Sequence, residues 1–414
     1  MKKENLSSGK QAVIERSRQL TEFVWTPLRD ITVYTKTAGK TKLPQGEKVK
    51  GMIYSSTEPT DKFIFENISF ETFATIVNNP DSALYTKDLN GHNNSWAYFG
   101  IVCNGLARYA LNINRRYSTK RWLDVPGMHK IFEHGKYTVD DMEICDVLLA
   151  YGEGRNHVAL VTDLVYNEEG KVTGVEVSEA IRPVCVRRLF TPEEYYEKFN
   201  LFAICRYDYI DSVPFPDQED SAFISKELIA KIPDIALDYG NKTNYRTYED
   251  VVISAFLDGE NEIEIRKGEE LIEKFTINGK GNVARKFERG YYTVTLVNTG
   301  TVLEFCVTEP EISHSVKDGV ITVRVNPNDD ESCISHLELR EKTRLAEGAD
   351  PQKLADETVN FYNPCCASLA KLFELTDEEK KTGVFSREIP NDAFNFKVVF
   401  KNKYGMWTHT MIEI

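Results

Sequence analysis

Apolar residues recur with a helical period in three stretches of the N-terminal half of the chain. Residues 8–25 carry one such face, and Pro27 is placed to end that helix. Residues 69–79 form a second amphipathic pattern, with Ser69 in the position of its cap. A third helical pattern begins at Cys103, directly after an apolar run. The chain is therefore expected to place three helices before its apolar period changes.

After the third helix the apolar period shortens to two, which is typical of strands with one buried face. The strand-like runs are residues 145–151, 157–166, 174–180 and 201–210. The sequence NEEG joins the second and third runs as a hairpin turn, and a capped helix begins after Thr191. Helices followed by antiparallel strands predict an α+β domain over residues 1–212.

The stretch DSVPFPDQEDS at 211–221 reads as a linker, because it combines two prolines with acidic residues and has little to bury. Beyond it, alternating strands are separated by Gly and Asn turns, which predicts two all-β sandwich domains of the immunoglobulin or fibronectin kind. We expect these at 222–309 and 310–414, the second with a partly helical insert at 345–380.

Charge and composition narrow the possible partners. The chain of 414 residues has a net charge of −13, which argues against a nucleic-acid partner and against docking on anionic lipid by charge. Its apolar runs are too short for a membrane span, and its start lacks the apolar segment of a signal peptide. The expected location is outside the cell or in the cell envelope, if this chain is a mature or trimmed form, and otherwise the cytoplasm. The oligomeric state is left open.

The eight cysteines are spread thinly, with neither the spacing of a metal site nor the density of a disulfide scaffold. Most are expected to be reduced and buried, as Cys185 and Cys205 are within strand-like runs. The seven histidines form no paired cluster, so the sequence predicts neither a metal nor any other cofactor.

Cys103 differs from the other cysteines in its surroundings. A thiol in the first turn of a helix lies near unpaired backbone N–H groups and the positive end of the helix dipole, and both favour the thiolate. Asn104 and Gly105 keep the following turn small and polar. The alternative is a buried core cysteine, since Cys is among the most buried residue types.

A cysteine nucleophile needs a base, and the base needs a group that orients it. His157 opens a predicted strand directly after the small polar loop GEGRN. On the next strand Val175, Val177 and Glu179 share one face, so Glu179 ends an apolar row and needs a partner. A surface histidine and a solvated glutamate are the alternatives.

Four motifs occur in an order that resembles the superfamily of NlpC-type peptidases and CHAP amidohydrolases. They are KGMIY at 50–54, VCNGLARY at 102–109, CDVLLA at 145–150 and NHVALVTD at 156–163, followed by VSEA. The resemblance covers about residues 50–210. It implies a papain-like fold with helices packed on an antiparallel sheet, and a cysteine hydrolase acting on peptides of the bacterial cell wall.

The resemblance also implies roles for single residues. Cys103 would be the nucleophile, His157 the base and Glu179 the orienting group, with Tyr54 near the oxyanion. Asn104, Ser55 and Trp96 are further candidates for the oxyanion site or for binding a peptide or muropeptide substrate. Val102 and Asn104 replace the usual Asp and Ser around the nucleophile. That leaves a catalytically inactive binding scaffold, or a related thiol acyltransferase, as alternative functions.

The segment between Tyr54 and Cys103 is long, and its loop LNGHNNSWAYFG contains His92 and Trp96. We expect this insertion to cap the substrate site; the alternative is that Trp96 only packs over the catalytic helix. A rival pair is Cys365 or Cys366 with His409. No acid is placed there to orient the histidine as Glu179 is for His157, so buried thiols are expected.

Two acids compete for the role of orienting group. Asp163 shares a strand face with His157 but lies six residues along, roughly 20 Å away. If the four-residue turn pairs Tyr166 with Lys171, position 180 lies opposite His157, and a bulge of one residue would make Glu179 its direct neighbour. Glu179 is therefore predicted, with Ser178 or a backbone carbonyl next in order.

Overall fold

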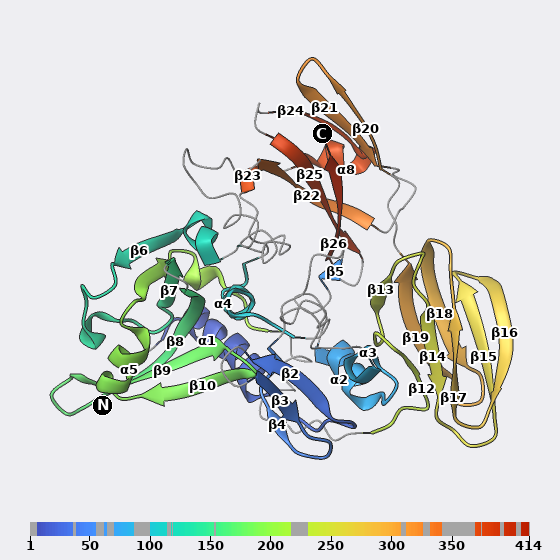
Figure 1. Cartoon of the computed structure of the whole chain (residues 1–414), viewed down its shortest axis with the longest axis horizontal. Helices are drawn as coiled ribbons and strands as arrows, with labels where there is room; N and C mark the ends of the chain where they lie inside the picture. The colour runs from blue at the N-terminus through green and yellow to red at the C-terminus, as the bar shows by residue number, and fades with distance from the viewer. Residues whose placement is uncertain are drawn as a thin grey trace. The chain divides into compact units, whose positions relative to one another are not determined.

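A computed structural model of the whole chain provides the structure (Figure 1). The residues that it describes are 6–35, 39–54, 62–63, 70–86, 100–113, 117, 119–152, 155–216, 231–307, 312–325, 332–341, 369–373, 375–389, 393–402 and 407–413. They form mainly β-strands with a few short helices. The chain divides into two compact units, residues 1–56 with 88–230 and residues 57–87 with 231–414.

The first unit is built on one six-stranded antiparallel sheet, in the order β10-β9-β8-β7-β11-β6. Its strands are β6 (Met128–Phe132), β7 (Val147–Gly152), β8 (Arg155–Tyr166), β9 (Val172–Ala180), β10 (Cys185–Phe190) and β11 (Ala203–Tyr207). The strands predicted from the period-two pattern are confirmed as β7, β8, β9 and β11. The sequence NEEG makes the predicted turn, with the N–H of Gly170 donating to the carbonyl of Asn167.

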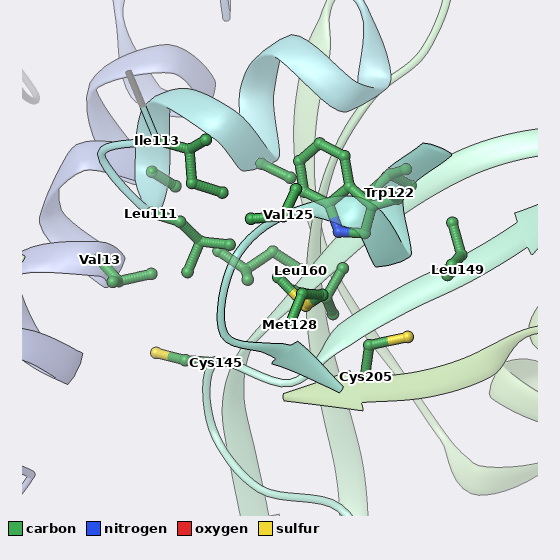
Figure 2. Close-up of a cluster of buried hydrophobic side chains, with 14 of the residues drawn as sticks. Val13, Leu111, Ile113, Trp122, Val125, Met128, Cys145, Leu149, Leu160 and Cys205 are labelled. Atoms are coloured by element: carbon green, nitrogen blue, oxygen red, sulfur yellow. The ribbon is translucent and has the colours of Figure 1, made fainter. Parts of the chain in front are cut away.

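Helices cover both faces of this sheet. On one face α1 (Ser8–Glu22) and α4 (Cys103–Ala110) pack on β7 and β8, around a cluster that includes Val13, Leu149 and Leu160 (Figure 2). On the other face α5 (Pro192–Phe199) packs on β8 and β9 through Tyr195 and Phe199. The sheet alternates between the two clusters residue by residue, as the pleat of a strand requires.

The remaining elements of the first unit are short. They are the strands β1 (Val24–Trp25), β2 (Ile31–Thr35), β3 (Gly39–Leu43) and β4 (Val49–Lys50), and the 3-10 turns η2 (Thr119–Asp124), η3 (Val139–Asp141) and η4 (Ile210–Ser212). The predicted first helix ends at Glu22, and the chain turns into β1 before it reaches Pro27. The apolar residue Val24 therefore belongs to a strand and not to the helix.

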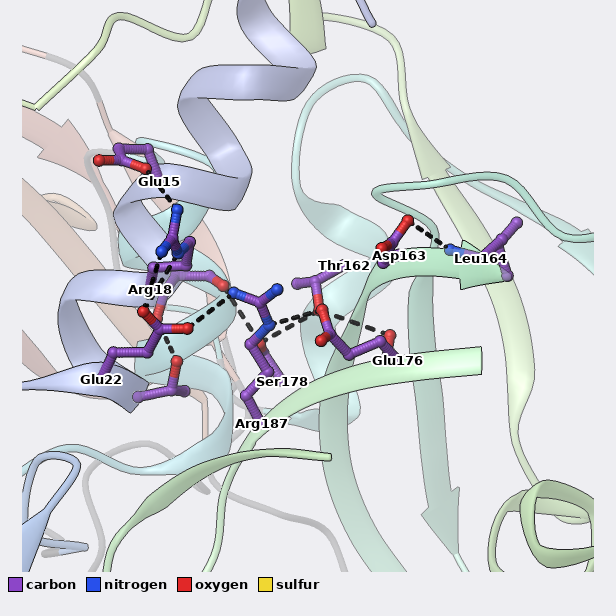
Figure 3. A network of polar contacts seen from close by, with 11 residues as sticks. Glu15, Arg18, Glu22, Thr162, Asp163, Leu164, Glu176, Ser178 and Arg187 are labelled. Atoms are coloured by element: carbon purple, nitrogen blue, oxygen red, sulfur yellow. Dashed lines mark hydrogen bonds and ion pairs between the residues drawn. The ribbon is translucent and has the colours of Figure 1, made fainter. Parts of the chain in front are cut away.

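A polar network joins helix α1 to the sheet (Figure 3). Arg187 of β10 pairs with Glu22 of α1 at 3.0 Å and with Glu176 of β9 at 2.5 Å. The hydroxyl of Ser17 donates to that of Ser178 at 3.1 Å inside the protein. Because these contacts fix α1 against β9 and β10, they also hold the strand on which Glu179 lies.

The second unit contains the helices α2 (Phe70–Asn78) and α3 (Ala83–Thr86), which the sequence places between Tyr54 and Cys103. The hydroxyl of Thr72 donates to the carbonyl of Asn241 at 3.0 Å. The amide of Asn79 donates to the carbonyl of Leu237 at 3.1 Å. Residues 70–86 thus pack with the following β-domain, although they lie within the range predicted for the first domain, and residues 87–99 lie outside the described residues.

Two sheets form the β-domain that follows. Their strands are β12 (Ile235–Leu237), β13 (Thr243–Tyr245), β14 (Val251–Ala255), β15 (Glu260–Lys267), β16 (Glu270–Asn278), β17 (Gly281–Arg285), β18 (Gly290–Leu296) and β19 (Thr301–Val307). Their orders are β12-β14-β17 and β13-β19-β18-β15-β16. Buried and partly exposed residues alternate along β15 and β18, so each presents one apolar face, as a sandwich requires.

Two further sheets lie in the C-terminal part. Their strands are β5 (Lys62–Phe63), β20 (Ile312–Lys317), β21 (Val320–Val325), β22 (Ser332–Glu341), β23 (Leu369–Phe373), β24 (Val384–Glu388), β25 (Ala393–Asn402) and β26 (Trp407–Glu413). Their orders are β20-β21-β24 and β23-β22-β25-β26-β5. The predicted insert at 345–380 contributes β23 and the start of helix α8 (Asp377–Thr382), while 342–368 lies outside the described residues.

None of the described helices is long and apolar enough to cross a bilayer.

Candidate active site

Cys103 is the first residue of helix α4, as the sequence predicted. The preceding Val102 has extended backbone angles and no side-chain cap, so no side chain at that position covers the first turn of the helix. The cysteine itself is 7 % exposed. The local structure therefore presents a sheltered thiol beside the N–H groups of a helix N-terminus.

His157 and Glu179 come together from β8 and β9. Nε2 of His157 lies 3.0 Å from Oε2 of Glu179, whose side chain is 1 % exposed against 21 % for the histidine. The imidazole also stands edge-on to the ring of Phe202 at a centroid distance of 5.9 Å. The carboxylate and the aromatic ring together fix the orientation of the imidazole.

The register of β8 and β9 explains this contact and differs from the predicted one. Tyr166 pairs with Val172 and not with Lys171, and the ladder ends at Leu160 opposite Ser178. Continuing that register puts Glu179 opposite Ala159, so His157 is its diagonal neighbour on the same face. Diagonal neighbours are about 7–8 Å apart, which long side chains bridge.

His157 and Cys103 shift each other's pKa. Burial alone would raise the pKa of the Cys103 thiol, but the hydrogen bond and charge of His157, with the N–H groups of Val158 and Asn104, lower it. Burial alone would lower the pKa of His157, yet its bonds to Cys103 and Glu179 raise that pKa to about 9. The pair therefore favours a thiolate beside an imidazolium.

Glu179 stays ionised although it is buried. Burial raises its pKa, but the hydrogen bond to His157 and the charge of Lys198 outweigh that effect and lower it. Lys198, on helix α5, donates to Oε1 of Glu179, and its ammonium lies 4.9 Å from the ring centroids of both Phe190 and Phe199. The positive charges of His157 and Lys198 thus hold the carboxylate between the sheet and α5.

The alternative orienting groups, Asp163 and Ser178, make hydrogen bonds with other partners. Oδ1 of Asp163 accepts from the N–H of Leu164 at 2.9 Å (Figure 3). The hydroxyl of Ser178 lies between those of Ser17 and Thr162, at 3.1 and 3.4 Å. Neither contact reaches the imidazole of His157.

Tyr54 is positioned beside the thiol by pairing with two other segments. It bridges Ile101 in parallel, and its N–H donates to the carbonyl of Pro183 at 2.8 Å. Burial and the nearby charge of Cys103 raise the pKa of its phenol, so the hydroxyl stays protonated and can donate a hydrogen bond. The guanidinium of Arg182 stands over its ring, with Cζ 5.3 Å from the centroid.

The other predicted site residues divide into two groups. The side-chain amide of Asn104 is buried and donates to the carbonyl of Tyr117, so it supports the loop after α4. Ser55, Trp96 and the remainder of the loop at 90–99 lie outside the described residues, as do Cys365 and Cys366. His409 lies on β26, and its side chain is outside the description too.

Three other buried cysteines, Cys145, Cys185 and Cys205, have the opposite electrostatics. Cys145, Cys185, Cys205 and Cys306 are buried and form no disulfide, as the sequence predicted for Cys185 and Cys205. Burial raises the pKa of Cys145 and of Cys205 to about 12, and it raises that of Cys185 too. Among the described residues, no group of three or more His, Cys, Asp or Glu side chains is arranged to hold a metal ion.

Sequence reasoning missed Lys198 and Arg182. Lys198 follows the capping box of α5 by four residues, and its role depends on which helix face meets β9, a tertiary fact. Arg182 lies three residues beyond Glu179 in the connection to β10, where a charged residue between two buried strands is an available but weak signal.

Comparisons with known proteins give no family for this chain. No protein-family model matches it, and no curated protein does. It is similar at 8% identity and a TM-score of 0.17 to alpha-2-macroglobulin from Escherichia coli spanning domains NIE-MG1, over 44% of this chain and 97% of that one.

Two other solved structures are similar at the same level. Fibronectin(III)-like modules of CbhA from Clostridium thermocellum share 13% identity at a TM-score of 0.16, over 44% of this chain and 92% of that one. A DUF3823 family protein from Bacteroides ovatus shares 11% identity at a TM-score of 0.14, over 42% of this chain and 97% of that one. Such low TM-scores carry no argument about what this chain does.

Proposed function

We propose that the first unit is a cysteine hydrolase of amide bonds. The observation that carries this proposal is the contact of His157 with the buried carboxylate of Glu179, together with the pKa of the Cys103 thiol, which His157 lowers. A nucleophile, a base within hydrogen-bond reach and a group that orients the base are the parts that acyl transfer needs. The thiol with the lowered pKa is also the one at a helix N-terminus, while the pKa values of three other cysteines are raised.

The first half of the reaction forms a thioester. The thiolate of Cys103 attacks the amide carbonyl, and negative charge develops on the carbonyl oxygen. The N–H of Cys103, at the start of α4, and the protonated phenol of Tyr54 are the donors available for that oxygen. The imidazolium of His157 gives its proton to the nitrogen as the C–N bond breaks, and the amine leaves.

The second half returns the enzyme to its starting state. His157 takes a proton from water, the hydroxyl oxygen attacks the thioester carbonyl, and the C–S bond breaks to release the acid and the thiolate. Because Nε2 of His157 lies against Glu179, Nδ1 is the nitrogen left to exchange a proton with the thiol and the water. Glu179 keeps this tautomer and stabilises the imidazolium in both halves.

The order of motifs makes peptides of the bacterial cell wall the first substrates to test. The motifs around Tyr54, Cys103 and His157 are similar to those of NlpC-type and CHAP enzymes, and this similarity also favours a papain-like fold for the first unit. The β-domains would then be spacers or binding modules of the immunoglobulin or fibronectin kind. An enzyme with this substrate would work in the cell envelope or outside the cell.

Mass spectrometry of products tests the proposal. The full chain is incubated with muropeptides and with a panel of short peptide amides, beside Cys103→Ala as a matched control. Cleavage by the wild type alone supports a hydrolase, and a gain of 18 mass units distributed between two fragments identifies the bond. Cleavage of peptides but not of muropeptides would remove only the cell-wall substrate. A chain inert toward both, with an unreactive Cys103, would indicate a binding scaffold.

A further inference from the structure

The connection between β9 and β10 lies against the segment that carries Tyr54. The N–H of Cys185 donates to the carbonyl of Met52 at 2.7 Å, and Ile53 and Val184 form an antiparallel bridge. With the bond from Tyr54 to Pro183, three consecutive contacts hold the two segments together. Arg182 begins this paired stretch, so its backbone position relative to Tyr54 is fixed.

The guanidinium of Arg182 lies over the ring of Tyr54. Its Cζ lies 5.3 Å from the centroid of the Tyr54 ring, and its charge acts on the Tyr54 phenol together with that of Cys103. A positive charge thus lies over the ring of Tyr54, whose phenol also senses the charge of Cys103.

Arg182 has no carboxylate partner among the described residues. Its Nε is buried and makes no hydrogen bond within the described part of the chain. Two other arginines of the same unit have carboxylate partners: Arg187 binds Glu22 and Glu176, and Arg206 binds Asp146. A buried donor that lacks a partner costs free energy unless a ligand supplies an acceptor.

We propose that Arg182 binds a carboxylate of the substrate next to the scissile amide. A guanidinium is always charged and presents its donors in a fork that fits the two oxygens of a carboxylate. The substrate class is therefore a peptide with a free carboxylate, from an acidic side chain or from a chain terminus, within one residue of the cleaved bond. This inference rests on the proposed function, since it assigns the specificity of the same site.

Two alkylating reagents of nearly equal size test it without a known substrate. Iodoacetate carries a carboxylate and iodoacetamide does not, and both modify the same thiolate. Their rates at Cys103 are measured at pH 7 by peptide mass spectrometry, in the wild type, in Arg182→Gln and in Arg188→Gln. Arg188 lies on β10 and is exposed, and its substitution by Gln changes the net charge by the same amount.

We expect the ratio of the iodoacetate rate to the iodoacetamide rate to fall about tenfold in Arg182→Gln and to stay near the wild-type value in Arg188→Gln. The iodoacetamide rate should change less than about twofold, because the substitution leaves His157 and the thiol in place. An unchanged ratio in Arg182→Gln, with rapid iodoacetamide reaction, overturns the carboxylate site and leaves the hydrolase. A Cys103 that reacts with neither reagent overturns the hydrolase itself.

Protection experiments separate the two sources of carboxylate. N-acetylglutamate α-amide offers only a side-chain carboxylate, and N-acetylalanine offers only a terminal one. The compound that slows iodoacetamide at Cys103 in the wild type, and not in Arg182→Gln, identifies the source. Protection that is equal in both proteins contradicts the role of Arg182.

Discussion

At Glu179, burial and ionisation oppose each other, and two cations decide the outcome. The carboxylate is 1 % exposed, which disfavours its charge, but His157 and Lys198 each approach one of its oxygens. A carboxylate in this position holds the imidazole by charge as well as by geometry. Its role in the reaction can therefore be tested by removing the charge and keeping the shape.

Glu179→Gln should keep the fold and lower turnover by about 10²–10⁴-fold, because the amide cannot stabilise the imidazolium. Asp163→Asn is the matched control, since Asp163 contacts only the neighbouring backbone among the described residues and should leave turnover unchanged. Both are measured as kcat with circular dichroism as the check on folding. Full activity of Glu179→Gln would show that another group orients His157.

Lys198→Met should lower kcat and move the acidic limb of the pH–rate profile to higher pH. Without the lysine charge the pKa of Glu179 rises toward the value that burial favours, so the carboxylate loses its charge at a higher pH. Lys198→Arg keeps the charge and should restore most of the profile. A merely structural role of Lys198 would lower stability in both variants without moving the pH limb.

The sequence predicted Cys103, His157 and Glu179 because each sits at the end of a regular pattern: a helix start, a strand start and the end of an apolar row. It could not predict Lys198 or Arg182, because their roles depend on which face of α5 meets β9 and on how the β9–β10 connection pairs with residues 52–54. Those facts arise from tertiary packing and leave no periodic signal.

Among the elements, the short segment 51–54 has the strictest backbone and packing requirements. Gly51 has a φ of +96°, and a Cβ there would lie 2.1 Å from the carbonyl oxygen of Cys185. Its N–H donates to Phe23 at 2.7 Å, and its carbonyl accepts from the indole of Trp25 at 3.0 Å. Only glycine allows this segment to lie against the start of β10 and so to place Tyr54.

Gly51→Ala should therefore destabilise the protein by about 3 kcal/mol, the sum of left-handed strain and a clash with backbone. Gly46→Ala is the control, because Gly46 has a similar φ of +77° but open space around it, and it should cost only about 1 kcal/mol. Urea unfolding of the full chain measures both. Equal costs would mean that the contact with Cys185 does not hold segment 51–54.

The regular strands and helices were predictable because period and caps agree along most of them. The register of β8 and β9 was not, because it depends on which residues the turn pairs and on irregularities near Val161 and Val165 that the sequence does not mark. The observed register differs by two residues from the one that would pair Glu179 directly with His157, so the two residues are diagonal neighbours on one face.

At the scale of the molecule, the insertion between Tyr54 and Cys103 does not stay in the first unit. Phe73, Ile76 and Val77 of α2 are fully buried, and the hydrogen bonds of α2 and α3 reach residues 237–241 of the second unit. The predicted substrate cap over 55–100 thus includes a segment, 70–86, that packs with a β-domain. No pattern in the sequence shows which core an inserted helix joins.

A fragment of residues 1–216 should be poorly soluble, because it keeps α2 without the partners that bury its apolar face. The same fragment with residues 57–87 replaced by a short Gly-Ser linker should be soluble and should retain a reactive Cys103. Size-exclusion chromatography and thiol alkylation compare the two. A soluble, folded but unreactive excised fragment would mean that the second unit helps to build the site.

The pH dependence of Cys103 alkylation by iodoacetamide tests the central claim most directly. Since the pKa of Cys103 is lowered, the thiolate persists as the pH falls below about 8.5, the ordinary thiol value, and is lost only below its own pKa. Below pH 8.5 the wild-type rate should exceed that of His157→Ala, and it should change again near pH 9, where His157 loses its proton. His157→Ala should leave a single rise at high pH. A wild-type rate that rises only above pH 8.5, unaltered by His157→Ala, would contradict an activated Cys103.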